Sequence, residues 1–463
     1  MSRLLIIGGS DAGISAGLRA CELDGSAEVI VAIADAYPNF SICGLPYYIS
    51  GDVPDWRSLA HRTLDELERA GMRMLLDHTA RAIDPGAKRV IVTDLGGTEL
   101  ELGYDRLIVA TGAQPIRPPI RGLDLPGVHV LHTMQNSFAV HQAARRRGTE
   151  SAVIVGAGYI GLELAEALGA RGLKVTVVEQ MQEVLPTVDP ELGAVVRGEL
   201  VSHGVEIVTG VRVETISEEG KALTVYGTPG LERAVDLVLV VVGVRPDSAL
   251  AAASGARIGV KGAIRTSRRM EMNLPDTFAA GDCTETYHRI LGAPTYLPLG
   301  TTAHKQGTVA GENAVGGDRL FEGSLGTQVV KVFELAAARS GLRDGEARDA
   351  GFDPLTVGSS ALDRKLYYPG ARELAMRITG DRTTGRLLGA QIVGHRDAQV
   401  AKRIDVPAVA MFGEMMVDDF NDLDLSYTPP FGSPWDAVQI AAHRWSRKHL
   451  SSARSPGTLG APT

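Results

Sequence analysis

Cys43 is either a small packing residue or a reactive thiol, and the sequence around it leaves this question open. It lies in the stretch "NFSICGLPYYISG", residues 39–51, and is one of only three cysteines in a chain of 463 residues. No C-x-x-C spacing gives it a local partner thiol. Taken alone, burial explains it best, because free cysteine is among the most buried residue types. A redox role would need a disulfide partner from a substrate, or oxygen chemistry that produces a sulfenic acid.

Three glycines indicate a second kind of chemistry, the binding of a dinucleotide. Gly156, Gly158 and Gly161 have the spacing G-x-G-x-x-G between an apolar strand and a helix. The first glycine permits a tight turn, the second lets a pyrophosphate approach, and the third lets the helix pack on the strand. Glu179 ends the next strand, where a carboxylate accepts bonds from ribose hydroxyls and repels a 2′-phosphate. We therefore predict NADH, with NADPH as the alternative.

The N-terminal stretch repeats this plan with one departure. An apolar strand leads into a turn from Gly8 to Gly13 and a helix, and the next strand, "AEVIVAIAD", ends in Asp35. Ser10 stands where the middle glycine would be. "YDRLIVATGAQP" closes a buried strand on a turn of small residues, and "VDLVLVVVGVRP" repeats this device after the second unit. The duplicated plan predicts two dinucleotide sites in an α/β protein.

Composition is that of an ordinary globular protein. Hydrophobic residues make up 44% of the chain and charged residues 22%, and the net charge is −8. This charge provides no basic field for nucleic acid or an anionic membrane. Three cysteines cannot form a disulfide framework, and no window approaches the ~18 apolar residues of a membrane span. With no signal peptide either, we expect a cytoplasmic protein without nucleic-acid or membrane partners, and we predict no metal site.

The pattern changes beyond residue 320. "GTQVVKVFELAAARSGL" and "ELAMRITGDRTTGRLLGAQIVG" predict strands, the second with a hairpin at "GDRTTG", and "AVAMFGEMMVDDF" predicts a helix. Together they indicate an α+β layer. The tail is polar and rich in Pro, Gly and Ser, so we expect disorder from about residue 448.

These motifs together resemble the pyridine nucleotide–disulfide oxidoreductases, in their single-cysteine branch of coenzyme A-disulfide reductases, NADH oxidases and NADH peroxidases. The resemblance runs from residue 3 to about 445 and includes "SICGLPYYISG", "YDRLIVATGAQP", "TFAAGDCTE", "LGTTAHKQGTVAGENAVGG" and "SYTPPFGSPWD". It implies an α/β fold with two Rossmann-like domains for FAD and NAD(P)H and a C-terminal α+β dimerisation domain. The implied division is 1–115 with 246–320 for FAD, 116–245 for NAD(P)H, 321–447 for dimerisation and 448–463 as a disordered tail.

The resemblance also implies the site residues. Cys43 would be the redox cysteine, at the positive end of a helix opening at residues 44–49, where a lowered pKa favours the thiolate. Tyr427 and one of Tyr367 and Tyr368 would complete the site from the partner subunit. Cys21 and Cys283 would be structural. The implied FAD contacts are Gly8, Ser10, Asp11, Ala12, Gly13, Asp35, Ala110, Thr111, Gly112, Gly281, Asp282, Thr302 and Ala303. The implied NAD(P)H contacts are Gly156, Gly158, Tyr159, Ile160, Gly161, Glu179 and Gly243, with Tyr159 as a gate over the nicotinamide pocket.

Three positions depart from the family's pattern. Asp11 stands where the oxidases and peroxidases carry a histidine, and we expect its carboxylate to accept backbone N–H groups at the start of the first helix. The alternative is a protonated Asp11 that acts as a donor. Ile42 and Thr308 stand where coenzyme A reductases carry a polar residue and an arginine, which leaves Arg19 and Lys305 as cations for a nucleotide phosphate.

The sequence thus predicts an FAD-dependent NAD(P)H:disulfide oxidoreductase. It would be a homodimer that reduces a small-molecule disulfide or persulfide, similar to coenzyme A disulfide, through Cys43. One alternative is an NADH oxidase or peroxidase that cycles Cys43 through sulfenic acid, with an oxygen species as substrate. The other is a flavoprotein that binds or senses redox state with negligible turnover.

Overall fold

The first glycine turn belongs to a five-stranded parallel sheet. The structure, a computed structural model, describes residues 2–220 and 222–453. The sheet has the order β18-β7-β1-β2-β3, and each neighbouring pair runs parallel. Its strands are nearly continuous apolar runs, as expected of a parallel sheet covered on both faces. They are β1 (Arg3–Ile7), β2 (Glu28–Ala32), β3 (Met72–Leu75), β7 (Arg106–Val109) and β18 (Thr277–Ala279).

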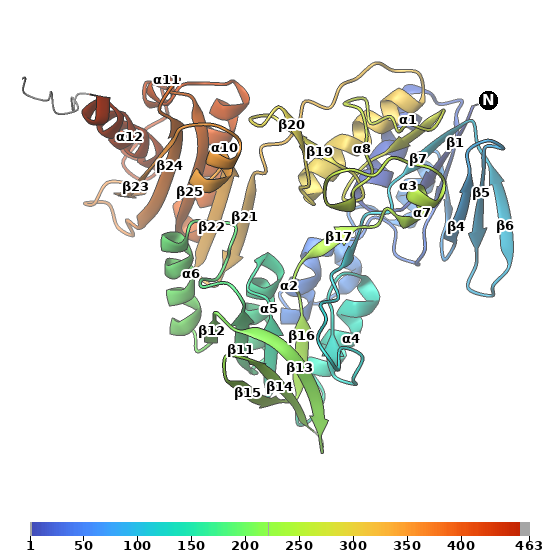
Figure 1. Cartoon of the computed structure of the whole chain (residues 1–463), viewed down its shortest axis with the longest axis horizontal. Helices are drawn as coiled ribbons and strands as arrows, with labels where there is room; N and C mark the ends of the chain where they lie inside the picture. Colours follow the sequence, from blue (N-terminus) through green and yellow to red (C-terminus); the bar gives the residue numbers. More distant parts are fainter. Residues whose placement is uncertain (1, 221, 454–463) are drawn as a thin grey trace, which may run out of the picture.

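Helices α1 (Asp11–Leu23) and α8 (Gly300–Ala314) cross closely beside this sheet (Figure 1). Glycine makes the close crossing feasible. A Cβ atom at Gly307 would lie 2.1 Å from the Ala12 carbonyl oxygen, and one at Gly311 would lie 2.2 Å from that of Ala16. The other elements of this unit are α2 (Leu45–Ser50), α3 (Leu64–Arg69), α7 (Ala249–Ala253), β4 (Thr79–Asp84), β5 (Arg89–Thr93), β6 (Glu99–Gly103), β19 (Thr286–His288), β20 (Ala293–Thr295) and the 3₁₀ helices η1 (Ile42–Gly44), η2 (Trp56–Leu59) and η3 (Val260–Gly262).

The second glycine turn lies in another parallel sheet, so the duplicated plan is confirmed. This sheet has the order β12-β11-β10-β16-β9. Its strands are β9 (Val128–His129), β10 (Ser151–Val155), β11 (Lys174–Glu179), β12 (Glu206–Thr209) and β16 (Leu237–Val240). The unit also contains α4 (Met134–Ala144), α5 (Tyr159–Ala170), α6 (Pro190–Ser202) and the antiparallel strands β13 (Arg212–Glu219), β14 (Ala222–Thr228) and β15 (Leu231–Val235). The chain passes between the two units through the paired strands β8 (Ala113–Pro115) and β17 (Val244–Pro246).

The C-terminal unit is an antiparallel sheet of order β21-β22-β25-β24-β23 with helices, which confirms the predicted α+β layer. "GDRTTG" forms the turn between β24 and β25, as predicted. The elements are β21 (Gln328–Val332), β22 (Leu335–Gly341), β23 (Pro354–Leu362), β24 (Glu373–Asp381), β25 (Leu387–His395), α9 (Asp344–Asp349), η4 (Arg396–Ala398), α10 (Val400–Phe412), α11 (Val417–Asn421) and α12 (Ala437–Ala453).

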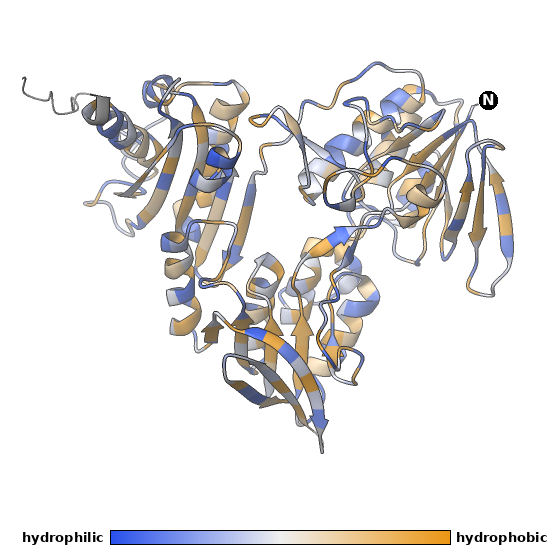
Figure 2. Cartoon of the chain, in the orientation of Figure 1, coloured by the Kyte–Doolittle hydropathy of each residue, from blue (hydrophilic) through white to orange (hydrophobic). Residues whose placement is uncertain are grey.

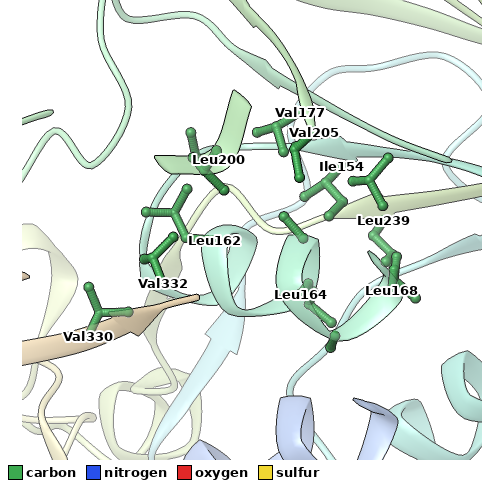
Figure 3. Packing of buried hydrophobic residues seen from close by; sticks show 14 of the residues in the cluster. Ile154, Leu162, Leu164, Leu168, Val177, Leu200, Val205, Leu239, Val330 and Val332 are labelled. Atoms are coloured by element: carbon green, nitrogen blue, oxygen red, sulfur yellow. The ribbon is translucent and has the colours of Figure 1, made fainter. Parts of the chain in front are cut away.

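One apolar core joins the second unit to the C-terminal unit. Figure 2 shows hydrophobic residues concentrated along the strands of both sheets. Val330 and Val332 of β21 belong to the same buried cluster as Leu162 and Leu164 of α5 (Figure 3). Because this cluster is continuous, the C-terminal sheet is anchored on the helix that opens at the second glycine turn.

The predicted disorder from residue 448 is wrong for residues 448–453, which continue helix α12. Trp445, only 1% exposed, donates its indole N–H to the Leu355 carbonyl at 2.7 Å, and His449 Nε2 lies 2.9 Å from the Arg382 carbonyl oxygen. These contacts stabilise the last turns of α12. The polar composition of the tail did not indicate them. The remainder of the predicted tail, 454–463, lies outside the described residues. Within the described chain, no helix is long and apolar enough to cross a membrane.

Candidate active site

The residues predicted to bind FAD gather where β1, β7 and β18 end at one edge of the first sheet. Gly8 follows β1 with φ +112°, and a Cβ atom on it would lie 2.1 Å from the Ala110 carbonyl oxygen. A Cβ atom on Gly13 would lie 2.0 Å from the carbonyl oxygen of Gly8, and one on Gly281 would lie 2.8 Å from the Cβ of Ala12. Ligands of α/β folds bind at this carboxyl edge.

Two positions at this edge leave room for a ligand. Ser10 caps α1 and is exposed, and its hydroxyl makes no capping hydrogen bond. A Cβ atom on Gly112 would meet no protein atom within 4 Å, so there is space beside this residue. The hydroxyl of the neighbouring Thr111 is already used, since it donates to the Asp247 carbonyl at 2.5 Å. The first N–H groups of α1 have no intrahelical partner, so this turn fits the diphosphate of FAD.

Carboxylates lie at both ends of the predicted FAD site. Asp35, half-buried beyond β2, accepts the Tyr37 N–H at 2.9 Å, and burial raises its pKa. This is the place where a dinucleotide unit binds a ribose. Burial raises the pKa of Asp282 to about 6, and the charge of Asp11 adds to that effect.

Helix α8 closes this edge with buried small side chains. Thr302 and Ala303 are buried in its first turn, and the Thr302 hydroxyl donates to Ser324 Oγ at 3.2 Å. Gln306 Oε1 accepts the Gly281 N–H at 2.9 Å and so ties the helix to the turn that precedes Asp282. The chain therefore offers an ordered wall rather than a mobile loop beside the expected flavin.

Cys43 lies between the two dinucleotide units, in η1 directly before α2. Pro46 occupies the first turn of α2, which matches the predicted helix start. An aromatic cluster holds the segment in place, with ring centroids 5.4–5.8 Å apart among Tyr37, Phe40, Trp56 and Phe138. Cys43 is exposed in this chain, whereas Cys283 is fully buried and Cys21 packs against the core, as expected of structural cysteines.

The expected lowering of the Cys43 pKa is not found. Its surroundings desolvate the thiolate and raise the pKa, and the carboxylates of Glu163, Asp11 and Asp282 raise it further. The residue is exposed as a whole, although neighbouring atoms desolvate its thiolate. The dipole of so short a helix does not outweigh three acidic neighbours.

The second glycine turn has the geometry of a diphosphate site. Gly156 has φ +108°, and a Cβ atom on it would lie 2.6 Å from the Val241 carbonyl oxygen. A Cβ atom on Gly161 would lie 2.0 Å from the carbonyl oxygen of Gly156, whereas one on Gly158 would meet no protein atom within 4 Å. The first and third glycines therefore serve packing, and the second leaves the backbone open to a ligand. Gly243, φ +105°, follows β16 at the same edge.

Glu179 is the buried carboxylate at the end of β11. Its two oxygens accept the N–H groups of Ala157, in the glycine turn, at 2.7 Å and of Met181 at 2.9 Å. Each carboxylate oxygen has a second lone pair, so ribose hydroxyls can still be accepted. Tyr159 and Ile160, the next predicted contacts, begin α5, and both are half-buried.

Two residues missed by the sequence analysis connect the cysteine to this second unit. The Tyr47 hydroxyl of α2 donates to Glu163 Oε1 of α5 at 3.3 Å. Burial raises the pKa of Glu163 to about 7. The available signal was a carboxylate within the apolar helix "YIGLELAEAL", since a buried Glu needs a partner or a proton.

The capping role expected of Asp11 is wrong. Asp11 is the first residue inside α1, and Ser10 is the cap. One of its oxygens lies 3.1 Å from where a Cβ atom of Gly300 would be, and its charge acts on Cys43 and Asp282. The side chain thus faces the catalytic region instead of its own helix.

Tyr367, Tyr368 and Tyr427 are not brought to Cys43 within one chain. All three are exposed in the C-terminal unit, and desolvation together with the hydrogen bond between Tyr367 and Tyr427 raises the pKa of Tyr367. In Figure 1 the strands β23 and β24, which precede and follow Tyr367 and Tyr368 in the sequence, lie at the left, and α2 lies near the centre. The exposed side chains of Phe431 and Trp435 extend this aromatic surface.

Sequence models of one family match both parts of the chain. The model of the pyridine nucleotide-disulphide oxidoreductases matches residues 2–307, and that of their dimerisation domain matches residues 327–437.

Known proteins match along almost the whole length. An NADH oxidase of Methanocaldococcus jannaschii is 33% identical over 443 residues, 95% of this chain and 98% of that protein. A CoA-dependent NAD(P)H sulfur oxidoreductase of Pyrococcus furiosus is 34% identical over 442 residues, 95% of this chain and 98% of that protein. The solved NAD-dependent persulfide reductase of A. fulgidus superposes with a TM-score of 0.93 at 36% identity, over 97% of this chain and 84% of that one. The protein therefore belongs to the pyridine nucleotide-disulphide oxidoreductases, enzymes that use FAD and NAD(P)H.

Proposed function

We propose that the protein reduces a small-molecule disulfide or persulfide with NAD(P)H through Cys43. The observation that carries this proposal is the exposed, unpaired Cys43 between two glycine turns that fit dinucleotides. A single cysteine cannot form an internal disulfide, so the second sulfur must come from the substrate. The names of the P. furiosus and A. fulgidus relatives, a sulfur oxidoreductase and a persulfide reductase, support this substrate class.

Different residues of the chain would carry out the binding of the cofactors and the reaction with the substrate. The turns at Gly8 and Gly158 would bind the two diphosphates, and Glu179 would accept ribose hydroxyls. FAD bound at the first site supplies electron transfer from NAD(P)H to sulfur. The Cys43 thiolate attacks one sulfur of the substrate, breaks the S–S bond and releases a thiolate, or hydrosulfide (HS⁻) from a persulfide RSSH. Two electrons and a proton then reduce the resulting mixed disulfide and release the second thiol.

The partner subunit would complete the site. We propose a homodimer in which Tyr427, with Tyr367 or Tyr368, approaches Cys43 of the other subunit and donates a proton to the leaving thiolate. The exposed aromatic surface in a unit that matches the family's dimerisation domain supports this arrangement.

The structure gives limited support to a coenzyme A substrate. Arg19 bonds to Glu312 at 2.7 Å and to Glu22 at 2.8 Å, so it is neutralised. The Thr308 hydroxyl donates to the His304 carbonyl of its own helix, which leaves Lys305 as the exposed cation of this pair of candidates. A substrate thiol without a phosphate group therefore fits these residues better than coenzyme A does. The cytoplasmic location remains a prediction, supported by three free cysteines.

The second candidate function is an NADH oxidase that cycles Cys43 through sulfenic acid, favoured by the name of the M. jannaschii relative. An acceptor screen that follows NADH absorbance, run anaerobically with each sulfur compound and separately in air, distinguishes the two functions. We expect rapid NADH consumption with a persulfide or small disulfide and little with air alone. Rapid consumption with oxygen and none with any disulfide or persulfide would contradict the proposal.

A further inference from the structure

The loop that follows Glu179 is held by the C-terminal unit. This loop, residues 180–189, connects β11 to α6 beside the second glycine turn. Three consecutive carbonyl groups in it accept hydrogen bonds from two arginines near the end of β22. Arg339 donates to Thr187 at 2.8 Å, and Arg343 donates to Pro186 at 2.9 Å and to Val188 at 3.2 Å.

The two arginines are themselves fixed. Arg339 is 9% exposed and donates to both oxygens of Glu346, at 3.1 and 2.6 Å, and to the Gly341 carbonyl at 2.6 Å. Arg343 bonds to the same Glu346 through Nε at 3.2 Å. Burial alone would raise the pKa of Glu346, but its bonds with Arg339 and the charge of Arg343 bring it down to about 2. The carboxylate is therefore charged throughout the working pH range.

The same loop contacts the predicted NAD(P)H residues. The Thr187 hydroxyl donates to the Tyr159 hydroxyl at 3.3 Å, and the Leu185 N–H donates to the Ala157 carbonyl of the glycine turn at 2.9 Å. Leu185 is fully buried with φ +52°, a left-handed conformation that an L-residue keeps only when its surroundings impose it. The loop is thus braced on both sides, by the arginines and by the turn.

Other contacts also attach the C-terminal unit to the second dinucleotide unit. Lys331 pairs with Glu166, and a continuous apolar cluster includes residues of both units (Figure 3). Arg377 pairs with Asp189, the last residue of the loop, at 2.6 Å. Arg339 and Arg343 differ because they bind the backbone carbonyls of residues 186–188, where the Thr187 hydroxyl bonds to Tyr159.

We infer that Arg339 and Arg343 are positioning residues of the NAD(P)H site, which fix Tyr159 and the glycine turn through the carbonyl groups of residues 186–188. This inference rests on the proposed function, in which Tyr159 borders the nicotinamide pocket. It assigns to the C-terminal unit a part in reduction by NAD(P)H, in addition to its part in dimerisation.

The test measures NADH reduction of the flavin in the holoenzyme by anaerobic stopped flow. Arg343 is partly exposed and Arg339 retains Glu346, so Arg343→Gln should fold. We expect its NADH dissociation constant to rise about fivefold, as loss of two hydrogen bonds to a ligand-contacting loop implies. Reoxidation of reduced enzyme by disulfide should stay within about twofold. Arg382→Gln is the matched control, because Arg382 bonds to Asp353 and the Pro354 carbonyl within the C-terminal unit.

A second pair of variants isolates the link to Tyr159. Thr187→Val removes the hydroxyl and should raise the NADH dissociation constant about threefold, whereas Thr187→Ser keeps it and should match wild type. Equal dissociation constants in wild type, Arg343→Gln and Thr187→Val would overturn the inference. An equal change in Arg382→Gln or in the disulfide half-reaction would also overturn it, since the effect would then be general. If NADH fails to reduce the wild-type flavin, the proposed function itself fails, and this inference fails with it.

Discussion

At the scale of single residues, the thiol of Cys43 has an acidic environment. Burial and the carboxylates of Glu163, Asp11 and Asp282 all raise its pKa. A thiol with a high pKa is a slower nucleophile at neutral pH, because less of it is thiolate. The acidic neighbours therefore become the residues that set its reactivity with pH, and each can be changed separately.

Asp11→Asn should lower the pKa of Cys43, because it removes a negative charge that acts on the thiolate. Thiolate would then form at lower pH, and the acidic limb of the pH profile of disulfide reduction should move to lower pH. The measurement is the initial rate against pH for variant and wild type. An unchanged profile would show that Asp11 does not face the sulfur. That result would favour the capping role of Asp11 and contradict the position described here.

Glu163→Gln should increase stability at alkaline pH. Burial raises the pKa of Glu163 from its ordinary 4.5 to about 7, so the folded chain binds this proton more tightly than the unfolded chain. The free energy of unfolding therefore falls by on the order of 2–3 kcal/mol as pH rises from about 4 to about 8. Glutamine keeps an acceptor for Tyr47 without a charge. Urea unfolding should show the variant more stable at pH ~8 and equal at pH ~4, and parallel pH curves would contradict the assignment.

At the scale of elements, local patterns were sufficient wherever sequence neighbours make the contact. Both glycine turns, the hairpin at "GDRTTG" and the helix after Cys43 were predicted, since the spacing of Gly, Pro and apolar residues determines them locally. The wrong predictions at this scale concern the orientation of one side chain and the end of one helix. Asp11 is a residue type that often caps helices, but it lies one position inside α1. The last turns of α12 depend on the buried Trp445, which the composition of the tail does not reveal.

Two glycines of the second turn should respond differently to alanine. A Cβ atom on Gly156 would meet the Val241 carbonyl oxygen at 2.6 Å in a backbone with φ +108°, so Gly156→Ala should lose about 1–3 kcal/mol of stability or more. Gly158 has room for a Cβ atom, so Gly158→Ala should keep the melting temperature yet raise the NADH dissociation constant about tenfold. Thermal unfolding and NADH titration measure the two effects. Normal NADH affinity in Gly158→Ala would contradict the diphosphate site.

At the scale of the whole molecule, the decisive contacts join residues far apart in sequence. Tyr47 meets Glu163, and Arg339 meets Thr187 from another unit. No local periodicity encodes such pairs, so the sequence predicted the glycine turns and the cysteine but not the residues that connect them. In the proposed homodimer, the predicted tyrosines would approach Cys43 from the second subunit.

Subunit exchange tests the shared site. Chains with Cys43→Ser mixed with chains carrying Tyr427→Phe should form heterodimers with one intact site. At statistical exchange we expect about a quarter of wild-type disulfide reduction, well above either parent. Native mass spectrometry confirms exchange. Activity no higher than that of the parents, with exchange complete, would show that Tyr427 acts within its own chain or not at all.

The proposed function depends most on Cys43 as the sulfur that reacts with the substrate. The direct measurement is anaerobic stopped flow on Cys43→Ser and wild-type holoenzyme, which follows flavin reduction by NADH and its reoxidation by disulfide or persulfide separately. We predict flavin reduction within about twofold of wild type and reoxidation slower by at least about 100-fold, because only the second half-reaction needs the thiolate. Equal slowing of both half-reactions, or reoxidation at the wild-type rate, would contradict the assignment of Cys43.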